Sequence, residues 1–208
     1  SRQAVLALRD VGPMPGAQVI ALQGGKIQSI GRTTEAAEST VALPALVNTH
    51  DHGRAVRTSS IGSDAKPLES WIHYLALFPA VDPYVAACVA FASSALGGAG
   101  IVMNHYTRVQ GFTDLPTELA EVSRAARDVG VRAGLAVAMR DRNPLVYGPS
   151  EPVLAALPPD VRPEIAQRFT RPPLSPRDYL MLMDEVVSAA DGPKFDVQYG
   201  PNGVQWCS

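Results

Sequence analysis

Residues 43–53 read LPALVNTHDHG, a short apolar run that leads directly into two histidines separated by one residue. Side chains alternate between the two faces of a strand, so His50 and His52 are expected to point the same way and Asp51 away from them. Two imidazoles on one face of a strand end can share one divalent ion. The stretch therefore predicts a strand that carries two metal ligands at its carboxyl end.

The chain beyond residue 44 alternates apolar runs with helical stretches, which is typical of strand–helix units in a parallel sheet. Helices are expected at 83–96, where an Asp-Pro pair opens the run, at 117–128, and from the Ser-Pro pair at 175–176. The proline-rich stretch 144–173 is expected to be a long connection with a short helical piece. The predicted strands are 45–49, 101–104, 132–139 and 195–199.

The segment before residue 45 follows a different pattern. Gly24 and Gly25 separate two short β-like runs, 19–22 and 26–30, which predicts a hairpin. We therefore expect residues 1–44 to form a small β domain and residues 45–208 to form the α/β domain. The chain starts without Met and stops directly after a predicted strand, so we expect both ends to be cut.

The composition is that of a globular protein with a sizeable core. The 208 residues are 46% hydrophobic and 18% charged, and the formal net charge is −2. This excludes a disordered chain and predicts no nucleic-acid partner, because such binding needs a basic surface. No apolar run has the length of a membrane span, so no membrane association is expected. Two cysteines without a Cys-x-x-Cys pair predict a reducing, cytoplasmic location.

Several stretches resemble the metal-dependent amidohydrolase superfamily, in particular its cytosine deaminase-like, guanine deaminase-like and triazine hydrolase-like branch. Residues 43–52 are similar to the strand-one pattern Pro-Gly-Leu-hydrophobic-Asn-x-His-x-His, with Ala45 in place of the glycine. Residues 67–72 resemble the Leu-x-x-Trp-Leu helix of the family, and 100–102 its second strand. Residues 199–208 resemble the Ala-Pro-His-x-x-Tyr-x-Cys-Ser segment of strand four, where Asn202 replaces the histidine.

The resemblance implies an α/β fold: the N-terminal half of a (β/α)8 TIM barrel, the metallo-dependent hydrolase fold, truncated after strand four and preceded by part of a small β-sandwich. It implies that His50 and His52 help to hold one divalent metal ion, zinc rather than iron, and that Asn202 faces the substrate. The other metal ligands and the proton-shuttling Glu would lie beyond Ser208, so the fragment alone is expected to be inactive.

The implied activity is hydrolytic deamination of an aminated heterocycle, nucleobase-like or triazine-like, by a metal-activated water. The expected partner is thus a small heterocyclic substrate, and a homo-oligomer of the full-length protein stays open. Three further residues are candidates for substrate binding, each with a structural alternative. They are His105 (or a strand cap), Arg140 (or an exposed salt-bridged loop) and Trp71 (or a half-buried wall).

Two alternatives remain. One is a cyclic amide hydrolase of the hydantoinase or dihydroorotase type, in which a carboxylated Lys on strand four bridges two metals. Lys194 precedes the fourth predicted strand and residues 195–199 contain no Lys, which counts against this type. The other is a non-catalytic fragment that lacks the second half of the site.

Overall fold

The computed structural model describes residues 3–11, 18–32 and 38–208. It divides the chain into two units, Ser1–Ala45 and Leu46–Ser208. The boundary expected after residue 44 lies one residue from this division. Each unit is described by itself below.

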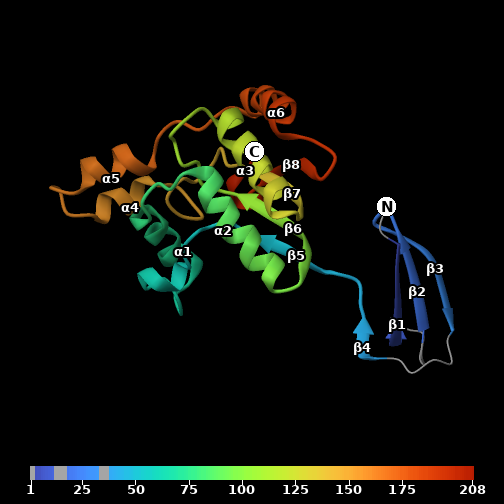
Figure 1. Ribbon diagram of the computed structural model, residues 1–208. Helices are drawn as coiled ribbons and strands as arrows, with labels where there is room; N and C mark the ends of the chain where they lie inside the picture. The colour runs from blue at the N-terminus through green and yellow to red at the C-terminus, as the bar shows by residue number, and fades with distance from the viewer. Residues whose placement is uncertain (1–2, 12–17, 33–37) are drawn as a thin grey trace. The chain divides into compact units, whose positions relative to one another are not determined.

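The first unit contains a four-stranded sheet with the order β3-β2-β1-β4 (Figure 1). The antiparallel pair β2–β3 turns at Gly24 and Gly25, whose φ angles of 57° and 76° suit a two-residue hairpin loop. The predicted hairpin is confirmed, whereas the predicted β-sandwich stays a prediction, because the described strands form a single sheet. The strands are β1 (Gln3–Val11), β2 (Gln18–Gln23), β3 (Lys26–Arg32) and β4 (Glu38–Ala42).

The second unit is built on a parallel sheet with the sequential order β5-β6-β7-β8 (Figure 1). Sequential parallel order requires a crossover after each strand, and α2, α3 and α6 provide these crossovers. All four predicted strands are present, and the third has the predicted bounds. The strands are β5 (Leu46–Asp51), β6 (Ala99–Tyr106), β7 (Arg132–Met139) and β8 (Phe195–Pro201).

Three long helices pack against one face of this sheet: α2 (Pro83–Leu96), α3 (Leu115–Val129) and α6 (Pro176–Ala190). The side chains buried between them and the sheet form one hydrophobic core. Alternate residues of β6 and β7 point into that core, so the residues between them point to the opposite face. Large apolar side chains that are almost fully buried in this core include Phe91, Val102, Leu119, Val122, Leu135, Val186 and Phe195.

Side-chain caps explain where the helices begin. Asp82 accepts a hydrogen bond from the Val85 amide (3.0 Å), and Ser175 caps α6 in the same way, as the sequence predicts. The predicted start of α3 at residue 117 is wrong by two residues, because Asp114 is the cap and accepts from the Thr117 amide at 2.8 Å. An Asp before a Leu-Pro pair therefore initiates this helix.

The proline-rich stretch 144–173 holds two helices, α4 (Glu151–Ala156) and α5 (Arg162–Phe169), rather than one helical piece. Each has a proline in its first turn, where the missing amide hydrogen has no intrahelical partner to lose. None of the helices in the described part of the chain combines the length and apolar character needed to cross a membrane. The remaining short helices are η1 (Thr58–Ile61), α1 (Leu68–Trp71), η2 (Ile72–Leu77) and η3 (Val204–Trp206).

A buried carboxylate fixes the loop that follows β6. Glu118 lies in the first turn of α3 with 0% of its surface exposed. It accepts hydrogen bonds from the Tyr106 hydroxyl and from the amides of Gln110 (2.6 Å) and Gly111 (3.0 Å). The side-chain carboxyl oxygens of Glu118 thus tie the loop to the helix.

We expect Glu118→Ala to lower the free energy of unfolding by roughly 3 kcal/mol, because it leaves these donors without a partner. Urea unfolding followed by circular dichroism measures the change. Glu121→Ala is the control on the same helix, since Glu121 makes a partly exposed ion pair with Arg124 and its loss should change stability by less than about 1 kcal/mol. Equal effects of the two substitutions would contradict the role of Glu118.

Candidate metal and substrate site

An irregularity in β5 sets the direction of the two histidines. On either side of it the register pairs are Asn48–Val102 and Asp51–Asn104. Two residues of β5 therefore stand opposite one residue of β6, which is the arrangement of a β-bulge. The extra residue keeps Asn48 and Asp51 on one face, and His50 turns to the other.

Hydrogen bonds hold Asp51 away from the histidines. Its carboxylate accepts from the Asn48 side-chain amide (2.9 Å) and from the Gly53 amide (2.7 Å). Gly53 has a φ of 59°, and a Cβ at this position would lie 2.5 Å from Nδ2 of Asn104. Only glycine fits this turn, which directs the chain away from β5 immediately after His52.

The two imidazoles converge on one point. Nε2 of His50 lies 3.4 Å from Nε2 of His52, and the rings meet edge to face with centroids 5.0 Å apart. Two nitrogen ligands about 2.1 Å from a tetrahedral ion are separated by about 3.4 Å. The pair therefore has the spacing that zinc requires of two of its ligands.

The tautomer of His52 is set by its neighbours. Nδ1 of His52 lies 3.0 Å from the main-chain oxygen of His105 and 3.3 Å from the hydroxyl oxygen of Thr107. A carbonyl oxygen only accepts, so Nδ1 carries the proton and Nε2 keeps its lone pair. Metal-binding histidines are commonly oriented in this way.

The surroundings of His52 and His105 favour the neutral form of their rings. Burial, followed by the charge of Arg54, lowers the pKa of His52. Burial, followed by the charge of His50, lowers the pKa of His105. A neutral ring is the form that binds a metal ion, so these pKa shifts keep His52 competent as a ligand below its usual pH range.

A cavity of about 800 Å³ opens beside the two histidines at the carboxyl ends of the strands. The structure brings every predicted site residue to its wall, although they come from separate parts of the chain. None of the described residues lining it is acidic. The predicted residues at the wall are His50, His52, Trp71, His105, Arg140 and Asn202.

His105 and Arg140 are held differently from what the structural alternatives predict. His105 stacks on His50 with ring centroids 4.1 Å apart, so it forms part of the site wall rather than only a strand cap. Arg140 is half-buried over the Trp206 ring, with 4.7 Å from its guanidinium carbon to the ring centroid, and donates to the main-chain oxygen of Asn143. The alternative that Arg140 belongs to an exposed, salt-bridged loop is wrong, because Arg140 makes no ion pair with the described residues.

The wall residues that sequence reasoning missed include Arg54, Thr107 and Trp206. Arg54 and Thr107 each lie two residues after a predicted site histidine, and that proximity is the signal that could have found them. Trp206 is 8% exposed and its indole packs between Arg140 and Tyr147. It lies within the segment that resembles strand four of the family.

The donor set of the described chain is incomplete for a closed metal site. No group of three or more His, Cys, Asp or Glu side chains with metal-binding geometry occurs among residues 3–11, 18–32 and 38–208. His50 and His52 would hold the ion, and imidazole nitrogens suit zinc better than magnesium or calcium. The residues present therefore fit part of a zinc site.

A scan against protein-family models and a search of the curated proteins found no match. Solved structures do match. A triazine hydrolase from Arthrobacter aurescens superposes on 100% of this chain with a TM-score of 0.67 and 18% identity, and the chain covers 48% of it. A variant of atrazine chlorohydrolase from Arthrobacter aurescens TC1, solved with zinc and atraton, gives a TM-score of 0.58, 18% identity and coverage of 98% and 48%.

The chain therefore shares its fold with these two structures and spans about half of their length. This shared fold confirms the resemblance to triazine hydrolase-like proteins seen in the sequence. A guanine deaminase from E. coli matches with a TM-score of 0.43, which is too low to bear on function.

Removal of either imidazole should abolish specific zinc binding. We expect His50→Ala and His52→Ala each to weaken zinc binding by more than the roughly 10- to 100-fold that loss of an outer hydrogen-bond partner causes. Competition with a chromophoric chelator measures this affinity. His73→Ala is the matched control, because His73 contacts Phe169 and lies outside the cavity wall. Unchanged affinity in the two site variants would show that the ion binds elsewhere.

Stability of the metal-free chain should fall as the pH falls below neutrality. Burial is the largest cause of the lowered pKa of His52, His73 and His105. Their unfolded forms bind protons at about pH 6.5, before the folded forms do, so protonation favours unfolding from there downward. Urea unfolding between pH 7.5 and 5 with a chelator present tests this. A constant free energy of unfolding, or NMR midpoints above 6.5 for these rings, would contradict it.

Proposed function

We propose that this chain supplies the first metal ligands and much of the substrate pocket of a metal-dependent hydrolase acting on carbon–nitrogen bonds. The reaction we propose is hydrolytic deamination of an aminated heterocycle, nucleobase-like or triazine-like. The observation that carries the proposal is the 3.4 Å separation of the two Nε2 atoms at the mouth of an 800 Å³ cavity. The fold match to a triazine hydrolase supports the same class of chemistry.

We further propose that residues 45–208 form the first half of a (β/α)8 barrel and residues 1–44 part of a β-sandwich. The sequential parallel order β5-β6-β7-β8 and the helices on one face support the barrel. Barrel enzymes place their sites at the carboxyl ends of the strands, and the cavity lies at that edge. The opposite sheet face, which includes Val47 and Ile101, would then belong to the barrel interior.

One zinc ion bound by His50 and His52 would supply a water of lowered pKa close to the substrate. The main-chain oxygen of His105 holds the His52 ring, so the two nitrogens stay aimed at one point. A planar heterocycle fits the cavity because Trp71 and Trp206 give it aromatic walls. The Asn202 amide can both donate to and accept from ring substituents.

Arg140 orients rather than reacts in this scheme. Its guanidinium is held by the Trp206 ring and by the main-chain oxygen of Asn143, which leaves further N–H groups for the substrate. No carboxylate among the described residues lines the cavity. We therefore propose that the group that moves the proton belongs to a part of the native protein outside these 208 residues.

The cyclic amide hydrolase alternative gains no support from the geometry. Lys194 precedes β8 and lies at the amino end of the sheet, whereas His50 and His52 lie at the carboxyl end. A carboxylated Lys194 would thus be at the wrong edge to share a metal ion with them.

The test is metal-dependent ammonia release by the native protein that carries these residues. Aminated pyrimidines, purines and s-triazines are the substrates, with cyclic amides in parallel. We expect turnover to disappear on chelation, to return with zinc, and to fall in His50→Ala by more than about 100-fold. His73→Ala should retain turnover.

Two results would overturn the proposal. Deamination that resists chelation would remove the metal from the mechanism. Hydrolysis of the cyclic amides alone would assign the protein to the alternative class.

A further inference from the structure

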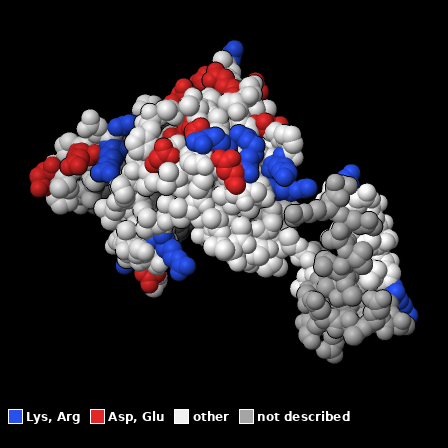
Figure 2. Space-filling model, viewed as in Figure 1, with Lys and Arg blue, Asp and Glu red and all other residues white. Residues whose placement is uncertain are grey.

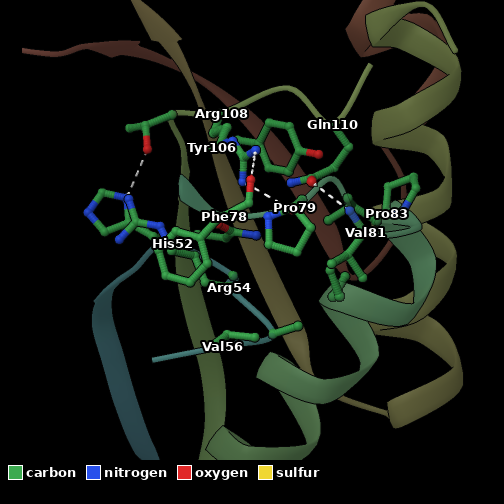
Figure 3. A pocket seen from close by; sticks show the side chains of 17 residues that line it. His52, Arg54, Val56, Phe78, Pro79, Val81, Pro83, Tyr106, Arg108 and Gln110 are labelled. Atoms are coloured by element: carbon green, nitrogen blue, oxygen red, sulfur yellow. Dashed lines mark hydrogen bonds between the residues drawn. The ribbon is translucent and has the colours of Figure 1, made fainter. Parts of the chain in front are cut away.

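A second, much smaller cavity of about 40 Å³ lies behind His52, within the Leu46–Ser208 unit (Figure 3). Figure 3 shows His52 and Arg54 on one side of it and Val81 and Pro83, where α2 begins, on the other. Its wall is largely apolar, but three polar side chains with hydrogen-bonding groups still free to bind a ligand also line it. These are the amide of Asn104 and the side chains of Arg54 and Arg108.

Asn104 is 1% exposed, and neither its Nδ2 nor its Oδ1 has a hydrogen-bond partner among the described residues. A buried polar group without a partner destabilises the folded state by about 1–3 kcal/mol. Nearly all buried side-chain polar atoms in proteins do have partners, so such an exception calls for a bound species. The close approach of Gly53, where a Cβ would lie 2.5 Å from Nδ2, fixes this amide against the cavity wall.

The charged residues that line the cavity are both basic, and the nearby Glu118 accepts hydrogen bonds from two other lining residues, Tyr106 and Gln110. Arg54 and Arg108 both line it, and none of the lining residues is acidic. Both guanidinium groups therefore contribute positive charge to the wall of the same small cavity. Arg108 donates to the main-chain oxygens of Phe78 (2.6 Å) and Pro79 (3.4 Å), which are neutral. Asp51 does not line the cavity but attracts Arg54 electrostatically. Its carboxyl oxygens already accept hydrogen bonds from Asn48 and Gly53.

Figure 2 places this local charge in context. On the face shown there, acidic and basic side chains of the second unit are interspersed, and neither sign forms a continuous field.

We propose that this cavity binds one small monovalent anion of halide size. The volume admits about one to three water-sized species, which excludes sulfate-sized and larger organic anions. A water molecule would give Asn104 a partner but would leave the two cations facing each other. A halide accepts from Nδ2 of Asn104, and its single negative charge offsets one of the two guanidinium charges.

The bound anion would join two loops. Arg54 follows β5 and the ligand His52, and Arg108 follows β6 and the outer partner Thr107. An anion shared by both arginines would therefore fix the loops that position the candidate metal ligands, without itself entering the larger cavity.

Thermal unfolding of the metal-free chain at constant ionic strength tests the proposal. Chloride or bromide replaces gluconate, which is too large for the cavity. We expect a saturable rise in Tm of about 2–4 °C in the halides. Arg54→Gln should abolish the rise. Arg57→Gln, which removes an exposed charge three residues away, should retain it.

Asn104→Leu gives a second, independent readout. It removes the partnerless amide, so in gluconate it should be at least as stable as the original chain, and it should show no halide-dependent rise. Crystals soaked in bromide should give an anomalous peak between Arg54 and Asn104. Equal Tm values in halide and gluconate, a rise that survives Arg54→Gln and Asn104→Leu, or a cavity holding only water in bromide would overturn the proposal.

Discussion

The bulge at the end of β5 is the constraint on which the candidate site depends. Without the extra residue, strict alternation from Asn48 would carry His50 to the helix-covered face, where the core is closed. With the extra residue, Asn48 and Asp51 lie on one face of the sheet and are hydrogen-bonded to each other, and the imidazoles of His50 and His52 lie on the other face. At Gly53, which has a positive φ, the chain then turns away from β5, so the backbone does not block the imidazoles of His50 and His52. A single inserted residue thus separates structural from ligand-binding side chains within one strand.

In a parallel sheet, the residues that follow the strands meet at the carboxyl edge. In the second unit, residues at the ends of β6, β7 and β8 all contribute to the candidate site at this edge. The end of β6 contributes both the ring that stacks on His50 and the carbonyl that orients His52. The ends of β7 and β8 contribute Arg140 and Asn202 to the same wall, although they are far apart in sequence. The buried side chain of Glu118 accepts hydrogen bonds from the amides of Gln110 and Gly111 and so holds the loop that follows β6. The site residues are therefore positioned both by hydrogen bonds and by ring packing at this edge of the sheet.

Much of this could be predicted from the sequence, and the misses have physical reasons. The strands, the hairpin and the caps Asp82 and Ser175 follow from local patterns, because each is decided by neighbouring residues. The bulge does not, since a period of two predicts the same facing for His50 and His52 whether or not β5 is irregular. Arg54 and Trp206 reach the site through tertiary folding of their loops. The salt-bridged-loop alternative for Arg140 fails because the Trp206 ring, not a carboxylate, packs against its guanidinium.

Both tryptophans of the chain, Trp71 and Trp206, line the larger cavity. Indole emission depends on local polarity and on nearby quenching groups, so the intrinsic fluorescence of this molecule originates at one place. Neither ring reports on the small β unit or on the helix-packed core. A planar ring entering the cavity, or a movement of the stacked Arg140, would alter that emission with no background from a remote indole. Changes at the larger cavity can therefore be followed by tryptophan fluorescence without labelling the protein.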